Sequence, residues 1–349
     1  MIVSLREVLE AQGMDRRHFV VISGTALTAF AHDWLLDPVR VAAAVQGKRV
    51  DHAVVDDLEG VAEARRRLDD ALGGGTVFRA VREDLRLVTE ILGNAGYTEA
   101  VGRRLYAVAA EFARLAGLLA VDGNNAAQAQ RYFMAGLRAA HSSGDRALGA
   151  NILGFMSKQA RDQDPRDAVR LAESALSGTT GLTPAMEAWI QGRLTTSAAC
   201  VGDRATADRA QERMFELTAA VDPATEPPWI YWWSDAEAHY HAGQSALALG
   251  RARPAEAHFR DALVRIDPTF PRDRINILIK LALARVHLHE LDGACRAAGE
   301  AGALLRRLDS QHKRTRLAEF RQVVQPYANT AQVKDFDARF ADLISSTSA

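Results

Sequence analysis

The 349-residue chain contains little cysteine, little lysine and no long apolar run. Its two cysteines, Cys200 and Cys295, cannot make a disulfide framework and are expected to be reduced core residues. No stretch approaches the roughly 18–20 uninterrupted apolar residues that a membrane helix requires, so no membrane partner is expected. Lysine and arginine number 43 and aspartate and glutamate 44, a balance that argues against a dedicated nucleic-acid binder.

The remaining composition is that of a globular protein. Apolar residues make up 48% of the chain and charged residues 25%, which excludes a disordered or fibrous protein. The length suits two domains or one continuous array. Only five of the 43 cationic residues are lysines, and this preference for arginine, together with abundant alanine, indicates a GC-rich genome.

Residues 15–21 imitate a twin-arginine export signal, because Asp-Arg-Arg-His-Phe-Val-Val is followed by an apolar stretch that ends at Ala31. Polar residues interrupt that stretch, and Trp34-Leu35-Leu36 continues the hydrophobicity beyond the supposed cleavage site. We therefore expect a buried helix here and a cytoplasmic protein.

Apolar residues recur at helical intervals, and period-two alternation is nearly absent, so the sequence predicts an all-α protein. Within it a template of small and aromatic positions repeats. The copy that begins at Ala236 places Ala242 and Gly243 on one helix, and Ala255 and Phe259 on the next, as in a tetratricopeptide (TPR) motif. The five copies begin at residues 110, 149, 188, 236 and 275 and are separated by 39, 39, 48 and 39 residues.

These repeats predict a TPR-like right-handed superhelix, an α solenoid of stacked antiparallel helix pairs with terminal capping helices. Residues 1–95 are expected to form a non-TPR helical segment for dimerisation or capping, with helices at 37–48, 53–72 and 76–93. The arginines at 65–67 are predicted to lie on a solvated hairpin arm. The other divisions are a TPR-like array at 96–309, capping helices at 310–344, near 311–325 and 330–344, and a disordered tail at 345–349.

Three strings accompany the repeats: Met14–Phe19, Arg67–Gly75 and Ser310–Leu317. Together they resemble the C-terminal sensor region of actinobacterial transcriptional regulators of the XRE (Cro/C1-type) family, in which a helix-turn-helix precedes TPR-like repeats. There is a more distant resemblance to the peptide-sensing TPR regulators of Gram-positive quorum systems. The resemblance implies a non-enzymatic ligand-sensing module for transcription regulation.

The chain departs from those regulators at its start. Roughly seventy residues of DNA-binding domain would precede the Asp-Arg-Arg-x-Phe string, and a helix-turn-helix needs two helices with a supporting core. Here only residues 1–14 precede it, so no direct DNA binding by this chain alone is expected. Whether such a domain was lost naturally or removed stays open at this point.

In a TPR superhelix the first helix of each pair lines the groove, and this geometry selects the candidate ligand contacts. Amide side chains can hold a peptide backbone through donor and acceptor together, and arginine or lysine can bind a carboxylate. The alternative is that these are ordinary solvated polar residues. The candidates are Asn151, Arg193, Trp229, Trp233, Glu237, Tyr240, His241, Gln244, Asn276 and Lys280, with Arg114 and Ser157 also predicted to face the groove.

Residues 227–233, Pro-Pro-Trp-Ile-Tyr-Trp-Trp, hold three of the five tryptophans and fall in the long 48-residue interval. Read as a helix, the segment places Trp229, Trp232, Trp233 and Tyr240 on one face. They would form either an aromatic wall for a hydrophobic ligand or a plug where the repeat register breaks.

Residue patterns for catalysis, metal or cofactor binding are weak. His239 and His241 are two residues apart on a predicted helix and point in nearly opposite directions, as do His287 and His289, so no metal site is expected. The glycines at 73–75 lack the context of a phosphate loop. The basic residues between Arg306 and Arg321 are read as a solvated cap face, or else as a surface for an acidic partner.

The sequence therefore predicts no catalytic residue, no enzyme and no cofactor. The leading hypothesis is a regulatory module that senses a peptide or small molecule in its concave groove. The alternative is a standalone scaffold for protein–protein interaction, and a homodimer is an open option for its assembly.

Overall fold

The structure, a computed structural model, describes residues 47, 49–72, 74–177, 181–308 and 310–345. The export-like string at 15–21, the helix expected at 37–48 apart from Gly47, and nearly all of the expected tail lie outside them. Ser345, assigned to that tail, is the last residue of a helix.

Within the described residues every named element is a helix, and the one β-bridge joins Arg49 to Gly96. In chain order the helices are α4 (His52–Leu72), α5 (Gly74–Asn94), α6 (Glu99–Asp122), α7 (Ala126–Ser143), α8 (Arg146–Ala160), α9 (Pro165–Ser177), α10 (Pro184–Cys200), α11 (Arg204–Ala219), α12 (Asp235–Ala248), α13 (Ala252–Arg265), α14 (Pro271–His287), α15 (Leu291–Leu305), α16 (Gln311–Val323), the 3-10 helix η3 (Gln325–Tyr327) and α17 (Ala331–Ser345). None of the described helices is long and apolar enough to cross a membrane.

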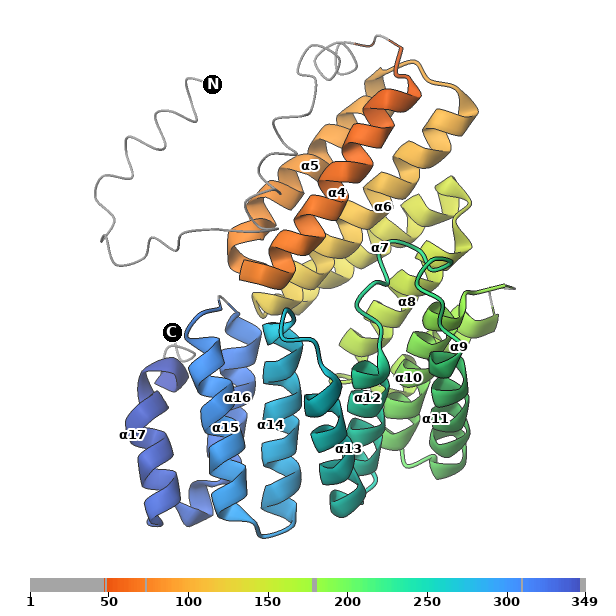
Figure 1. The fold of residues 1–349 in the computed structure, drawn as a ribbon. Helices are drawn as coiled ribbons and strands as arrows, with labels where there is room; N and C mark the ends of the chain where they lie inside the picture. The colour runs from red at the N-terminus through yellow and green to blue at the C-terminus, as the bar shows by residue number, and fades with distance from the viewer. Residues whose placement is uncertain (1–46, 48, 73, 178–180, 309, 346–349) are drawn as a thin grey trace, which may run out of the picture.

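Helices α6 to α15 form five antiparallel pairs, each stacked on the next (Figure 1). The predicted all-α, TPR-like superhelix is thereby confirmed. The same template position on the second helix is alanine in all five pairs, and each side chain is fully buried, because only a methyl group lets the backbones of a pair approach closely. These residues are Ala129, Ala168, Ala207, Ala255 and Ala294.

Two pairs show the contact that the template requires. The ring of Phe133 lies over Gly117, and the ring of Phe259 lies over Gly243 in the same way. A Cβ atom added to Gly243 would stand 2.6 Å from Cε1 of Phe259, closer than carbon atoms can approach. The glycine is therefore a packing requirement rather than a turn residue.

Gly243→Ala is expected to lower the free energy of unfolding by about 1–3 kcal/mol, since the Phe259 ring must leave its position. Gly149→Ala is the matched control. A Cβ atom there would meet its nearest neighbour, Cδ1 of Leu137, at 3.9 Å. This variant should gain up to about 1 kcal/mol from helix propensity. Urea denaturation measures both, and a loss of equal size in the two variants would contradict the packing argument.

Helices α4, α5 and the first half of α6 form an N-terminal bundle (Figure 1). The prediction of a solvated arm at 65–67 is wrong, because Arg65 and Arg66 are only 5% and 6% exposed. Arg65 pairs with Asp84 of α5, and Arg66 with Glu111 of α6. These buried ion pairs fix α4 against its neighbours.

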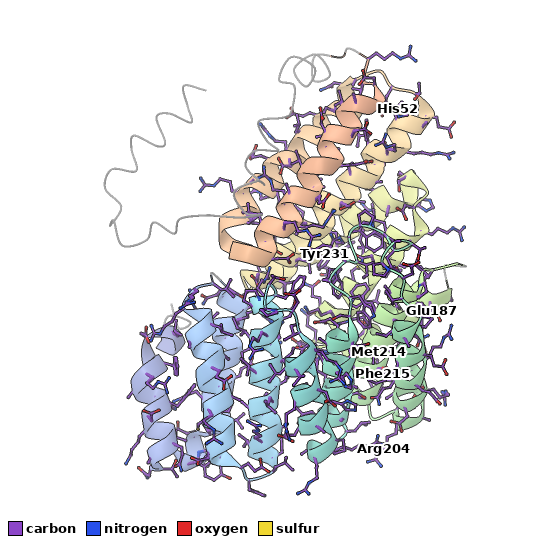
Figure 2. All side chains as sticks on the ribbon, in the orientation of Figure 1. His52, Glu187, Arg204, Met214, Phe215 and Tyr231 are labelled. Atoms are coloured by element: carbon purple, nitrogen blue, oxygen red, sulfur yellow. The ribbon has the colours of Figure 1, made fainter. Side chains whose placement is uncertain are left out.

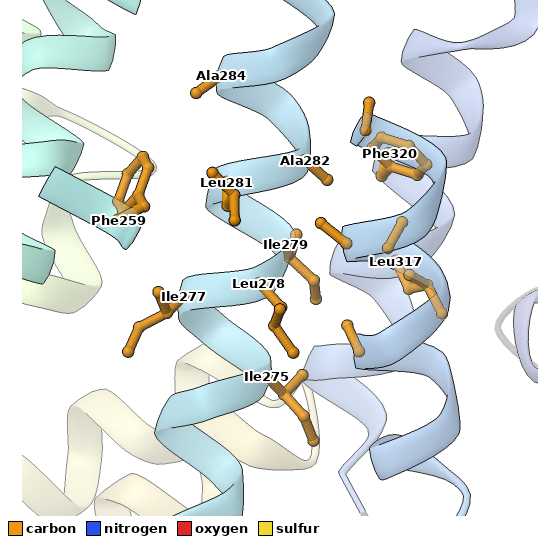
Figure 3. Packing of buried hydrophobic residues seen from close by; sticks show 14 of the residues in the cluster. Phe259, Ile275, Ile277, Leu278, Ile279, Leu281, Ala282, Ala284, Leu317 and Phe320 are labelled. Atoms are coloured by element: carbon orange, nitrogen blue, oxygen red, sulfur yellow. The ribbon is translucent and has the colours of Figure 1, made fainter. Parts of the chain in front are cut away.

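Helices α16 and α17 cover the last pair, as the predicted cap requires. Figure 3 shows the buried aliphatic side chains of α14 between Phe259 of α13 and two residues of α16, Leu317 and Phe320. Phe336 and Phe340 of α17 extend this cluster. The cap thus supplies the apolar surface that a sixth pair would have supplied.

The array curves until its C-terminal part meets its N-terminal part. Helix α14 contacts α4 and helix α16 contacts α6 (Figure 1). At the second contact the Asn124 amide donates to the Thr315 hydroxyl at 2.7 Å, and the Ser310 hydroxyl donates to Asp122 at 2.8 Å. Arg316 of α16 also pairs with Asp162 after α8. The helix pairs therefore surround a space instead of leaving an open groove.

Candidate functional site

A cavity of about 360 Å³ lies inside this curve. Its walls come from the first helices of all five pairs, from α4 and α16, and from the connector at 220–234 between α11 and α12. The first-helix rule therefore locates the interior surface correctly. Because the cap and the N-terminal bundle also contribute, a molecule held there would touch parts of the chain that are remote in sequence.

Seven of the ten candidate ligand contacts line the cavity: Arg193, Trp229, Glu237, Tyr240, Gln244, Asn276 and Lys280. Arg114 lines it as well. Ligand contact by these residues stays a prediction, but their shared position agrees with it.

The other three candidates, Asn151, Trp233 and His241, are buried in helix packing and do not line the cavity. The Asn151 amide faces the sulfur of Met186, and the Trp233 indole donates to the Thr218 hydroxyl at 3.2 Å.

His241 is fully buried against Arg193, and burial together with that guanidinium lowers its pKa well below the usual value. Ser157, also expected in the groove, donates to the Ala168 carbonyl at 2.7 Å and so joins α8 to α9. Position on a first helix did not separate the faces that point to the cavity from those that point to the partner helix.

The aromatic segment is part of the connector and not of a helix, since α12 begins only at Asp235. The predicted helical spacing of its tryptophans is therefore wrong. The segment belongs both to the cavity lining and to the core, because Trp229, Tyr231 and Trp232 line the cavity and Trp233 is core; ligand contact by these rings stays a prediction. Figure 2 places Tyr231 where the N-terminal bundle meets the repeats.

Aromatic rings form a continuous surface on one side of the cavity. Trp189 of α10 contacts Phe155 of α8, with ring centroids 4.7 Å apart, and meets the Trp232 ring edge-on at 5.6 Å. We call Phe155, Trp189 and Trp232 the aromatic wall. Trp189 is 1% and Phe155 8% exposed, so Trp232, which is half-buried, is the ring of the wall that a ligand could reach.

An ionic network stands at the junction of α4, α6, α14 and α16. Arg272 binds Asp69 and lies 2.8 Å from Asp122, which Lys313 also approaches at 3.7 Å. Although burial opposes it, the two carboxylates raise the pKa of Arg272. Burial raises the pKa of Asp69 despite this cation.

Asp70 adds a second carboxyl group at this junction. It accepts a hydrogen bond from the Tyr231 hydroxyl, and burial with the adjacent Asp69 raises its pKa to about 7. The network therefore joins the N-terminal bundle, the last pair, the cap and the connector at one place.

A second charged region, called here the basic wall, consists of Lys158, Arg161, Arg193 and Lys280. Burial and neighbouring cations lower the pKa of Lys158 and of Lys280 to about 8. They lower that of Arg193 to about 9. Burial and Asp273 raise the pKa of Glu237 to about 8, so the carboxyl group nearest to Arg193 is largely neutral at pH 7. Positive charge in this part of the cavity is poorly compensated.

Sequence reasoning missed Lys158, Lys313 and Arg316 as cavity residues. The last two had been assigned to a solvated cap face, yet Lys313 is 4% exposed. A signal was present, since three of the five lysines in the chain line the cavity.

The histidines of α12 face different helices. His239 lies beside His258 of α13, with 3.1 Å between the Nδ1 atoms, whereas His241 packs on α10. Asp261 is 3.9 Å from His239. In the part of the chain that the structure describes, no group of three histidine, cysteine or acidic residues has a geometry that could hold a metal ion.

No family model matches the sequence, and no curated protein matches it. Solved structures do. A Rap protein complexed with competence and sporulation factor is 15% identical, covering 93% of this chain and 87% of that one, with a TM-score of 0.56. The apo form of the quorum sensor NprR from B. thuringiensis is 14% identical and covers 93% of each chain, with a TM-score of 0.41. The similarity to the Rap protein supports the fold.

Proposed function

We propose that this chain is a TPR-like regulatory module that senses a small molecule or a short peptide in its cavity. The observation that carries the proposal is the closed curve, which brings the N-terminal bundle, all five pairs and the cap to one space. The strings that resemble XRE-family sensor regions support a role in transcription regulation. The Rap protein of similar fold was solved with a bound factor, so this architecture can hold one.

A ligand in this position would act on the superhelix as a whole. It would touch the cap through α16 and the N-terminal bundle through α4, and these parts otherwise meet through few contacts. A ligand shifts a conformational equilibrium only as far as it binds the two states differently. Contacts on both sides of the closure supply that difference, because opening the curve would break one set of them.

The alternative, a scaffold that binds another protein in its groove, suits this cavity less well. A protein partner usually covers about 800 Å² of each surface. The cavity of about 360 Å³ lies in the size range of small-ligand pockets.

A thermal-shift and calorimetric screen against short peptides and metabolites tests the proposal, with Asn276→Trp as a blocked variant. Asn276 lines the cavity, and its side chain donates one long hydrogen bond, 3.4 Å, to Asp273, so an indole there should occupy the space at little cost. Ligands found with the unchanged protein should lose at least about tenfold in affinity, or about 1.4 kcal/mol.

Gln322→Trp is the control, because Gln322 is exposed on the cap and does not line the cavity. It should bind every ligand as the unchanged protein does. Equal binding to Asn276→Trp would place the ligand elsewhere, and a screen without any ligand would remove the sensor proposal.

A further inference from the structure

The basic wall lacks the partners that cations in a protein interior normally have. Lys158 and Lys280 form no ion pair or hydrogen bond with any residue that the structure describes. Arg161 donates to Gln244 at 3.1 Å and has Asp162 only at 3.9 Å. Lys158 is exposed, Lys280 and Arg161 are half-buried, and all three side chains line the cavity, so their charge faces that space.

Two buried arginines that line the cavity also have unused donors: Arg193, which faces Lys158, and Arg114. Arg193 is 5% exposed, and its Nε has no acceptor among the described residues. Arg114 is 3% exposed, and neither its Nε nor one of its terminal nitrogens has an acceptor there. An unsatisfied buried donor costs about 1–3 kcal/mol. Both side chains line the cavity, where a bound acceptor could reach them.

The carboxylates of the cavity are committed elsewhere. Asp162 pairs with Arg316, and Asp69 and Asp122 share Arg272. Glu237 is the acidic side chain that interacts electrostatically with Arg193. It is largely protonated at pH 7, because burial raises its pKa to about 8. Asp273 also lines the cavity and faces Lys158, so the protein supplies less negative charge here than the four cations of the basic wall carry.

The basic wall borders the aromatic wall. The Arg193 guanidinium lies 5.7 Å from the ring centre of Trp189, and that of Arg114 lies 5.6 Å from the ring centre of Phe155. A ligand that places an anionic group among the cations would thus rest its remaining atoms on flat apolar surface. The two surfaces together define a composite site.

We infer that the cavity recognises its ligand through an anionic group, a carboxylate or a phosphate, held by Lys158, Arg193 and Lys280, next to a planar apolar moiety that packs on the aromatic wall. This inference rests on the proposed function and adds the chemistry of the ligand to it. Charge-assisted hydrogen bonds are the strongest that these donors can make, and the anion would satisfy the unpaired arginine nitrogens together with the lysines.

Proton uptake follows from this arrangement. An anion beside the two lysines raises their pKa values, so binding near pH 8 takes up protons, whereas at pH 6 both lysines are already charged. Affinity should therefore fall as the pH rises through 8 to 9. The groups that face these lysines are Arg161, Arg193, Lys313 and Asp273 around Lys158, and Arg161, Asp162, Arg316 and Glu319 around Lys280.

The experiment compares two matched probes, indole-3-acetate and its neutral amide, and adds phenyl phosphate as the phosphate arm. Calorimetry with the full chain should show indole-3-acetate or phenyl phosphate binding at least about tenfold more tightly than the amide at pH 7. The better of the two anions identifies the carboxylate or the phosphate as the preferred group. Its binding should weaken between pH 7 and pH 9.5.

The double variant Lys158→Gln, Lys280→Gln should bind the anionic probes no better than the amide. It should fold at least as well as the unchanged protein, since it removes two unpaired charges whose pKa values are lowered. Lys334→Gln is the control, because Lys334 is exposed on α17 and remote from the cavity lining. It should leave every affinity unchanged.

Two results would overturn the inference. If the anion and the amide bind equally, and Asn276→Trp abolishes both, the cavity is a ligand site without an anion preference, and the proposed function survives. If the anionic probes bind the double variant as well as they bind the unchanged protein, the basic wall does not hold them. Failure of all three probes likewise rejects the anion site, while the peptide and metabolite screen decides the sensor role separately.

Discussion

Arg272→Met is expected to lower the free energy of unfolding by about 3–5 kcal/mol, the usual cost of removing one partner from a buried ion pair. The guanidinium is 16% exposed, and its partners Asp69 and Asp122 are 10% and 5% exposed. Asp69 would lose its one ion-pair partner within the described residues, whereas Asp122 would keep Lys313 and the Ser310 hydroxyl. These ion pairs would be lost at the place where α14 contacts α4.

The loss in free energy of unfolding caused by Arg272→Met should depend on pH. Without Arg272 the pKa of Asp69 rises further, so the folded variant takes up a proton that the unfolded chain does not hold. The deficit relative to the unchanged protein is therefore largest at pH 8 and shrinks toward pH 5. Urea titrations at both pH values measure it.

Arg103→Met is the matched control, because Arg103 and its partner Glu99 are 63% and 80% exposed, and such surface pairs contribute little. A small deficit for Arg272→Met that does not change with pH would show that the network does not hold the two ends of the array together.

Trp189→Ala is expected to destabilise the protein by about 3–5 kcal/mol, as large-to-small changes at buried aromatic positions do. Trp189 is 1% exposed, and it packs on Phe155, on Trp232 and on the backbone at Gly154. Its removal deletes the centre of the aromatic wall and enlarges the cavity. Because the hole is apolar on that side, free indole should bind in it and restore part of the lost thermal stability.

Phe259→Ala provides the comparison for that rescue. Phe259 is fully buried between α12 and α13 and does not line the cavity, so the stability loss should be similar. Indole is larger than the missing phenyl ring and should give no comparable recovery. Recovery of both variants to the same extent would point to nonspecific binding, and no recovery of Trp189→Ala would mean that the wall collapses into the space.

The repeat architecture was predictable because it depends on local sterics. Alanine at one position of every second helix, and glycine facing an aromatic ring in two pairs, are requirements that each pair imposes on its own sequence. The contact between the first and last parts of the array was not predictable in this way. Asp122 and Ser310 are 188 residues apart and meet only because small rotations between successive pairs accumulate.

The site was predictable to the same extent as the repeats. Knowing which helix faces inward placed six candidates on the cavity wall, including Arg193 and Lys280, and the aromatic segment added Trp229. It failed for Asn151 and His241, whose side chains pack on α10. It also missed Lys313, because a position in the cap gives no sign that the cap returns to the first pair.

The contact between the two ends of the array also affects how the protein unfolds. An open solenoid can fray from either end, since a terminal repeat is held on one side only. Here α16 is held by α6 through Asn124 and Asp122, so the last units are braced by the first. The two ends of the array should consequently unfold together with its middle rather than before it.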